Sequence, residues 1–349
     1  MKLKHLIFSS FICFLLIACN KEPIVNSEMS ETFYLRNNGT DMPVFVRGNG
    51  ESKVFVLLLH GGPGDGGLKY RGHTYSDLLE DEYAMVYWDQ RHQGNSHGHM
   101  EDTDFTIDMM VEDTYALIQT LKVRYGDDIS VFLMGHSWGG TLGTAFMLKD
   151  DYQHEVNGWI EVDGAHDFQL MNREMIRMIN TIGQAELDAN HHNTLWTEII
   201  AYANSLDTNN ISLDETIQLN SYAGRIEGLF DQLNEKSQSN LGDLELNFTG
   251  PNNPTAADIN DLQIPSDFYD ELINYSATPM LHKITTPTLL QWGEFDFKVP
   301  PKMGEITFNE ISSTDKFLKI YQHSGHSPMR YEPALFVSDM IAFIEAYKN

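Results

Sequence analysis

Short apolar runs alternate with segments of helical spacing in the first half of this chain. Residues 54–59, 84–88, 131–134 and 158–162 are mostly apolar runs with the length of a buried strand. Between them, residues 106–124 place apolar side chains three or four positions apart, which is typical of an amphipathic helix. Strands that alternate with helices predict an α/β fold with a doubly wound, mainly parallel sheet.

This rhythm is interrupted in the second half of the chain. Residues 166–283 contain no convincing buried-strand run, and helical stretches such as 195–202 and 213–230 dominate. Strand-like runs return at 287–292 and 317–321. We therefore expect a helical cap inserted into one core. The predicted boundaries are 33–165 for the first part of the core, 166–283 for the cap and 284–349 for the second part of the core.

The N-terminal segment has the pattern of a bacterial export signal. Two lysines precede a largely apolar run, residues 6–18, which is shorter than the ~20 residues of an ordinary membrane-spanning helix. The run ends at Cys19 in a sequence that resembles a lipobox, where cleavage leaves the cysteine as a lipidated N-terminus. We expect residues 1–18 to be a signal peptide, Cys19 to anchor the protein to a membrane of the cell envelope, and residues 19–32 to be a tether. The alternative is a plain secretory signal.

Composition excludes several kinds of site. The chain has 23 Lys and Arg against 50 Asp and Glu, a formal net charge of −27, so we expect no nucleic-acid partner. This acidity either serves solubility or attracts a cationic substrate. The two cysteines, Cys13 and Cys19, both precede the predicted core. The core therefore has no possible disulfide, thiol nucleophile or cysteine-based metal site.

A serine between two glycines lies where a predicted strand turns into a predicted helix. Residues 135–139 read Gly-His-Ser-Trp-Gly, the G-x-S-x-G pattern of a nucleophile elbow. Such a turn lifts the serine hydroxyl above the sheet at a helix N-terminus, whose partial positive charge favours a nearby anion. The pattern predicts Ser137 as a nucleophile, and the alternative is a capping serine in a glycine-rich turn.

A serine nucleophile needs a base, and the base needs an acid that orients it. Asp296 follows the predicted strand 287–292, and we prefer it as the acid over Glu294. His326 comes after the next predicted strand and directly follows a glycine, and we prefer it as the base over His323. The order Ser, Asp, His is the order that this kind of elbow requires.

The first strong strand leads into a glycine-rich loop, residues 60–64, with the sequence His-Gly-Gly-Pro-Gly. Acyl transfer needs two N–H donors directed at the developing oxyanion. We expect one donor from Gly62 or Gly61 and the other from Trp138, the residue after the nucleophile. A phosphate-binding loop is excluded because no Gly-Lys-Ser/Thr follows.

Three motifs together resemble the proline iminopeptidases, a family of α/β-hydrolases. They are residues 60–64 (HGGPG), 89–96 (DQRHQGNS) and 135–140 (GHSWGG), and Asp296 and His326 follow in the expected order. The resemblance implies an α/β-hydrolase core with a cap, a serine peptidase that forms an acyl-enzyme, and no metal or organic cofactor. Family members typically have Gly at the position of His92. We expect the polar residues 89–91 to hold loops below the site rather than to contact substrate.

Peptidases of this family hold the free α-amine of the substrate with carboxylates of the cap and rim. The resemblance therefore makes Glu198 and Glu227 of the cap candidates, and Glu161 and Asp163 at the end of the fourth core strand could reach the same rim. Gly61 is a further substrate-binding candidate. An aminopeptidase that acts on small peptides is the first hypothesis. The alternatives are a hydrolase of small esters, amides or lactones, and a catalytically silent binding lipoprotein.

Overall fold

The computed structural model describes residues 25–98, 105–229 and 264–349. The predicted signal peptide, Cys19 and residues 19–24 of the predicted tether lie outside these described residues. The described part forms one sheet of nine strands. The strands are β1 (Met29–Asn37), β2 (Thr40–Gly48), β3 (Val54–Leu59), β4 (Ala84–Trp88), β5 (His97–Gly98), β6 (Ser130–His136), β7 (Gly158–Val162), β8 (Thr288–Gly293) and β9 (Lys316–Tyr321).

The sheet has the order β1-β2-β4-β3-β6-β7-β8-β9, with β5 paired to β2. Strands from β4 to β9 in this order run parallel, and β1 and β2 form an antiparallel edge. All residues of β3 and β6 are buried, because helices cover both faces of a parallel sheet. The predicted doubly wound, mainly parallel α/β fold is confirmed.

The predicted end of the tether at residue 32 is wrong, because β1 begins at Met29. This strand pairs with β2 from Met29 opposite Gly48 to Asn37 opposite Thr40. One of its faces is solvated, so polar residues alternate with the buried Met29 and Leu35. An edge strand of this composition lacks the continuous apolar run that revealed the central strands.

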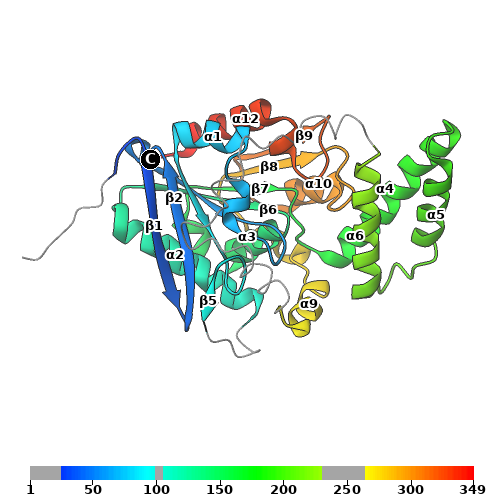
Figure 1. The fold of residues 1–349 in the computed structure, drawn as a ribbon, viewed down its shortest axis with the longest axis horizontal. Helices are drawn as coiled ribbons and strands as arrows, with labels where there is room; N and C mark the ends of the chain where they lie inside the picture. The colour runs from blue at the N-terminus through cyan, green and yellow to red at the C-terminus, as the bar shows by residue number, and fades with distance from the viewer. Residues whose placement is uncertain (1–24, 99–104, 230–263) are drawn as a thin grey trace, which may run out of the picture.

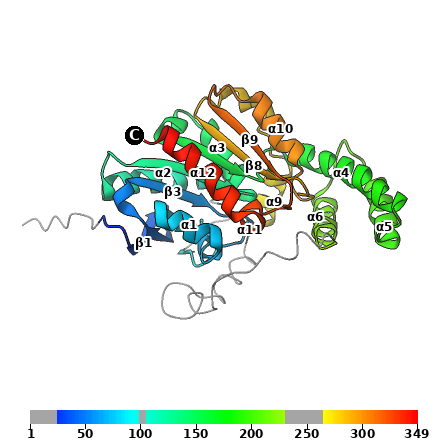
Figure 2. The ribbon, with the colours of Figure 1, turned by 90° about the horizontal axis from the view of Figure 1, so that it is seen from above.

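Helices form a layer on each face of the sheet (Figures 1 and 2). Helices α1 and α12 pack together over one face, and α2 and α3 pack together over the other. Thr106 caps α2 by accepting a hydrogen bond from the Met109 N–H. The core helices are α1 (Thr74–Glu82), α2 (Ile107–Tyr125), α3 (Trp138–Leu148), α10 (Pro301–Glu310), α11 (Pro328–Tyr331) and α12 (Pro333–Tyr347), with short 3-10 helices η1 (Gly50–Ser52), η2 (Gly67–Tyr70), η4 (Tyr152–Glu155) and η5 (Thr278–Lys283).

Between β7 and β8 the described residues form helices and no strand of the sheet. Figures 1 and 2 show α4 and α5 projecting away from the sheet, with α6 beside α4. These helices bury a hydrophobic cluster of their own, which includes Ile179, Trp196 and Leu219. Phe297, which comes from the loop after β8, inserts into this cluster and links the cap to the core. The helices of this segment are α4 (Phe168–Asp188), α5 (Asn193–Ala203), α6 (Leu213–Glu227) and α9 (Ser266–Ile273).

No helix within the described ranges combines the length and the apolar character that a membrane crossing requires.

Candidate active site

Ser137 occupies a strained turn between β6 and α3. Its backbone has φ 55° and ψ −119°, a conformation that a residue with a side chain rarely adopts. The turn needs glycine at position 139, because a Cβ there would lie 1.9 Å from the carbonyl oxygen of Leu59. The elbow thus brings the serine to the carboxyl end of β6, directly before the first turn of α3.

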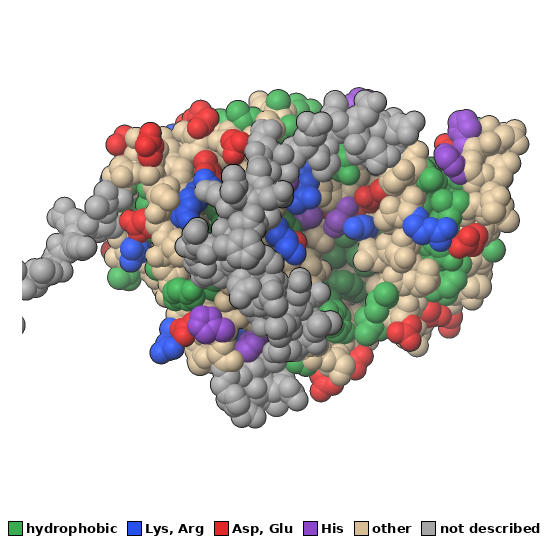
Figure 3. All heavy atoms as spheres, in the orientation of Figure 1, with side chains coloured by type: hydrophobic (Ala, Val, Ile, Leu, Met, Phe, Trp, Pro, Cys, Tyr) green, Lys and Arg blue, Asp and Glu red, His purple; other side chains and the backbone are tan. Residues whose placement is uncertain are grey.

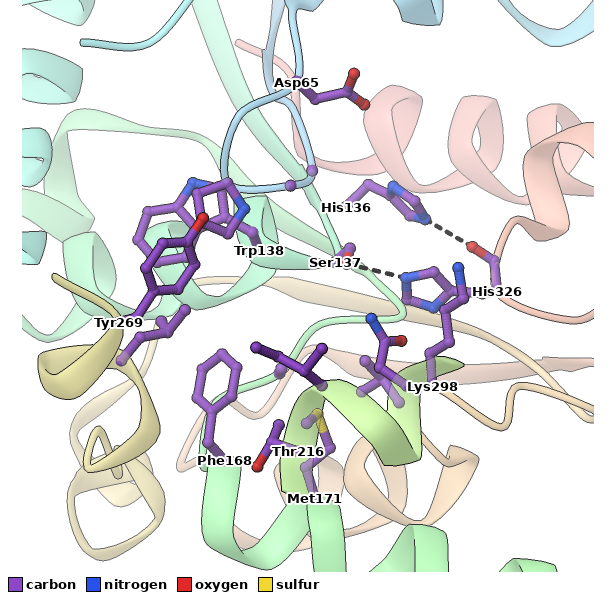
Figure 4. Close-up of a pocket in the computed structure, with 18 of the residues that line it drawn as sticks. Asp65, His136, Ser137, Trp138, Phe168, Met171, Thr216, Tyr269, Lys298 and His326 are labelled. Atoms are coloured by element: carbon purple, nitrogen blue, oxygen red, sulfur yellow. Dashed lines mark hydrogen bonds between the residues drawn. The ribbon is translucent and has the colours of Figure 1, made fainter. Parts of the chain in front are cut away.

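A chain of two hydrogen bonds joins three residues that are distant in the sequence. His326 Nε2 lies 2.9 Å from Ser137 Oγ (Figure 4). His326 Nδ1 lies 2.8 Å from Asp296 Oδ2. Asp296 is fully buried, and its other oxygen accepts hydrogen bonds of 2.9 Å from two backbone N–H groups of its own loop. Glu294 and His323, the alternative acid and base, are both exposed and take no part in these hydrogen bonds.

Burial controls the protonation of these groups. It lowers the pKa of His326 to about 3, and the nearby positive charge of Lys298 lowers it further. His326 is therefore neutral, and its Nε2 is free to accept the serine proton. Beside Asp296, burial raises the pKa of Asp163 well above its usual value, and the Asp296 charge adds to this rise. Burial also raises the pKa of Asp296 to about 7, but two backbone N–H groups donate to its carboxylate and oppose this rise. Asp163 therefore holds its proton more readily than Asp296, and Asp296 is the acid of the pair whose charge orients His326.

The glycine-rich loop lies next to Ser137. The N–H of Gly61 donates to the hydroxyl of Tyr70 at 2.8 Å, so this donor is occupied. In the described part of the chain, the N–H groups of Gly62 and Trp138 have no hydrogen-bond partner. Gly62 has φ 119°, and a Cβ there would lie 2.7 Å from the N of Gly64. Of the two glycines left open by the sequence, the geometry therefore favours Gly62 as the donor beside Trp138.

The loop after β4 holds in place the two segments that carry the expected oxyanion donors, Gly62 and Trp138. Gln90 donates through Nε2 to the His60 carbonyl at 3.0 Å and accepts from the Trp138 indole N–H at 2.8 Å. Gln93 accepts from the Gly64 N–H at 2.7 Å. These side chains lie outside the cavity and hold loops in place. His92 has φ 51°, in the left-handed region, a conformation that suits glycine better than a residue with a side chain.

Tyr70 and His136 extend the network, and no sequence motif indicated either role. The Tyr70 hydroxyl donates to His136 Nδ1 at 2.7 Å, and His136 Nε2 donates to the carbonyl of His326 at 2.8 Å (Figure 4). Burial lowers the pKa of His136 well below its usual value, so it remains the neutral acceptor that this arrangement needs. The chain links the Gly61 loop to the backbone of His326.

One group of potential metal ligands occurs among the described residues. Atoms of His136, Asp163 and His326 lie within 4.8 Å of one another. Both ring nitrogens of His136 and both ring nitrogens of His326 already take part in hydrogen bonds within the protein. Binding a metal there would break the hydrogen bonds that orient both histidines, so we assign no metal to this group.

A cavity of about 420 Å³ opens above Ser137. Gly61, Gly62 and Trp138 line its floor together with the serine and His326. The opposite wall is largely apolar and comes from α4, α6 and α9 (Figure 4). Its main side chains are Phe168, Met171, Leu213, Ile217, Tyr269 and Leu272.

None of the four predicted amine-binding acids lines this cavity. Glu161 and Asp163 are fully buried, so their expected position on the rim is wrong. Glu161 lies against Gly140 and Gly164 below the start of α3, because alternation along β7 directs it into the layer between sheet and helix. The expected position of Glu198 is also wrong. It lies on the outer side of the cap, where it pairs with Arg225 at 3.1 Å.

Glu227 is the candidate acid of the cap that lies near Asp296 and His326. It ends α6, and its carboxylate lies beside Gly325 and accepts a 3.3 Å hydrogen bond from the Phe297 N–H. Burial raises its pKa to about 7, and the Asp296 charge contributes to this rise. Glu227 therefore changes its charge near neutral pH, close to His326.

This chain is similar to known proteins over most of its length. The family model for the alpha/beta hydrolase fold matches residues 54–333. The chain is 25% identical over 305 residues to the probable aminopeptidase YbaC of Bacillus subtilis. The aligned region covers 86% of this chain and 92% of that protein. It is 28% identical over 300 residues to the proline iminopeptidase of Thermoplasma volcanium, with coverages of 84% and 89%.

Solved structures show the same fold. A proline iminopeptidase-related protein from Thermus thermophilus superposes with a TM-score of 0.60 at 19% identity, over 92% of this chain and 99% of that one. An esterase from Exiguobacterium antarcticum superposes with a TM-score of 0.58 at 19% identity, over 91% and 100%. This chain belongs to the α/β-hydrolase family, as a hydrolase that resembles the proline iminopeptidases over most of its length.

Proposed function

We propose that this chain is a serine aminopeptidase that releases an N-terminal residue, proline or a similar small residue, from short peptides. The hydrogen-bonded chain from Ser137 through His326 to Asp296, on the floor of a cavity, is the observation that supports it most. The similarity to an aminopeptidase and to proline iminopeptidases supports the substrate class.

The proposed reaction uses only groups of this chain and water. Ser137 Oγ attacks the peptide carbonyl while His326 Nε2 accepts its proton. The N–H groups of Gly62 and Trp138 donate to the resulting oxyanion. His326 then returns the proton to the leaving amine, and the C–N bond breaks. Water attacks the acyl-enzyme with His326 as base, which releases the amino acid and restores the serine.

Selection of a free N-terminus requires a partner for a cationic amine that leaves water, since an unpaired buried charge is costly. We assign this role to Glu227, because its carboxylate lies beside Gly325, next to His326, whereas Glu161 and Asp163 are completely buried and Glu198 pairs with Arg225. The apolar wall of the cavity would receive the side chain of the same residue.

Glu227→Gln is expected to raise KM for prolyl arylamides substantially, by an amount corresponding to about 2–5 kcal/mol. N-acetylated arylamides should be poor substrates of both proteins. Because the pKa of Glu227 is raised to about 7, its carboxylate forms as the pH rises through 7. KM of the wild type for the free-amine substrate should therefore fall between pH 6 and pH 8. This dependence should be absent in Glu227→Gln, and steady-state kinetics over this range measure both effects.

Glu198→Gln is the matched control, because Glu198 is a cap acid paired with Arg225 on the outer side of the cap. It should keep the wild-type KM and pH profile. Equal turnover of free and N-acetylated substrates by the wild type would reject the aminopeptidase and favour a carboxylesterase, which the same residues could serve. A panel of simple aryl esters, run beside the arylamides, separates the two functions.

We also propose that Cys19 carries a lipid that holds the enzyme at a membrane of the bacterial envelope. Cys19→Ser is expected to abolish lipidation and release the protein from the membrane fraction. Several acyl chains on one residue anchor far more firmly than a single chain does. Metabolic labelling with a clickable fatty acid and fractionation measure both effects. Cys13→Ser, within the apolar run, should leave the anchor intact, and unlipidated wild-type protein would refute the proposal.

A further inference from the structure

Two basic side chains line the cavity without an acidic partner. Lys298 follows Asp296 by two residues, and Arg330 follows His326 by four residues on α11. In the part of the chain that the structure describes, neither side chain forms a hydrogen bond or an ion pair. The Nε of Arg330 is shut off from solvent and has no hydrogen-bond acceptor.

Unpaired cations are unexpected in a chain with 23 basic and 50 acidic residues. Asp65, which also lines the cavity, is already paired with Lys69 at 2.6 Å. Glu227 lies near Lys298 but forms no ion pair with it within the described residues. Figure 3 shows basic side chains around the central hollow of this face. A partly desolvated cation without a partner is costly, and an anionic ligand removes that cost.

The position of the two cations indicates which part of a substrate would carry the anion. Figure 4 shows Lys298 rising beside His326, and its charge lowers the pKa of this histidine. Arg330 lies on α11, which begins two residues after His326, and it lines the cavity beside this histidine and Ser327. Both cations therefore lie on the histidine side of Ser137. The leaving group departs on this side, because His326 donates the proton to it.

We propose that Lys298 and Arg330 bind a carboxylate on the leaving group, so that the preferred substrates are dipeptides, whose C-terminal carboxylate lies close to the scissile bond. This proposal rests on the proposed peptidase function and adds the second end of the substrate to it. Arginine suits the role because its planar fork binds carboxylate through two parallel hydrogen bonds. A bound carboxylate would also offset the charge of Lys298, which lowers the pKa of His326.

The test compares kcat/KM for the dipeptide Pro-Gly with kcat/KM for its amide, Pro-Gly-NH₂. The wild type should prefer the free acid by about 10- to 100-fold, the value of one or two charge-assisted hydrogen bonds. This ratio should fall toward one in Arg330→Gln and in Lys298→Gln, and Arg330→Lys should keep part of it. Lys348→Gln removes the same charge from the exposed end of α12 and should keep the wild-type ratio.

A second pair of substrates separates failure of this proposal from failure of the peptidase function. 4-Acetoxybenzoate carries its carboxylate on the leaving group, and methyl 4-acetoxybenzoate lacks that charge. If neither peptide is cleaved but Arg330→Gln loses a preference for the acidic ester, the carboxylate site stands and the peptidase function falls. The carboxylate site is refuted if the wild type turns over the acidic and the neutral substrates equally well. It is also refuted if Arg330→Gln and Lys298→Gln both keep the wild-type ratio of kcat/KM values. Thermal melting verifies that each variant is folded.

Discussion

Ser137→Ala is expected to lower kcat by roughly 10⁶-fold on whichever peptide or ester the enzyme turns over best. The variant lacks the oxygen that attacks the carbonyl, and the remaining rate comes from the oxyanion donors and binding alone. His326→Ala should lose about as much, because no other base lies within reach of Ser137 Oγ in the described structure. Asp296→Asn should lose somewhat less, because the serine and histidine remain. Double variants should be little worse than Ser137→Ala, because the residues act as one unit.

The runner-up residues supply matched controls for this experiment. His323→Ala and Glu294→Gln change exposed side chains outside the hydrogen-bonded chain, so both should keep near-normal kcat. A fluorophosphonate should label wild type and not Ser137→Ala, since it reacts only with an activated serine. Loss of activity in His323→Ala with retention in His326→Ala would overturn the assignment of the base. An unlabelled wild type would favour a binding protein without catalysis.

The second large effect concerns stability. Arg91→Met is expected to lower the free energy of unfolding by about 3–5 kcal/mol, because it leaves a buried carboxylate without its partner. Arg91 binds both oxygens of Asp113 at 2.8 and 2.7 Å and also donates to Thr40 Oγ1 at 2.9 Å. The two charged side chains are 1% and 0% exposed, so water cannot replace the lost contact. The pair joins the loop after β4 to α2 and to the edge of the sheet. Urea unfolding measures the change.

Two further variants make this result specific. Arg36→Met breaks the pair with Asp41 at 2.6 Å, in which the arginine side chain is 76% exposed, and should change the free energy of unfolding far less than Arg91→Met does. The double variant Arg91→Met/Asp113→Leu removes both buried charges and should be more stable than Arg91→Met. If Arg91→Met cost no more than Arg36→Met, the buried pair would have no special part in holding the loop.

Local patterns in the sequence were sufficient for the central elements and for the nucleophile. The runs that became β3, β4, β6 and β7 are apolar because helices cover both faces of a parallel sheet, and this leaves a signal within a few residues. The elbow around Ser137 is equally local, because the strained turn itself demands the glycines on either side. Chain order then selected Asp296 and His326 before any distance was known. The half-solvated strand β1 lacks such a run, so its first residues, 29–32, were assigned to the tether.

Only the tertiary structure decided which side chains meet. Ser137 and His326 are 189 residues apart, and the hydrogen bond between them exists because parallel strands end at one edge of the sheet. The choice of Gly62 over Gly61 depended on Tyr70, a single tyrosine in a loop without a motif. Glu227 could not be separated from the other candidate acids by sequence, since a carboxylate looks the same in a chain whether it faces solvent, a helix or the histidine. The partners of a charged side chain are set by the packing of distant elements, and neither composition nor spacing records that packing.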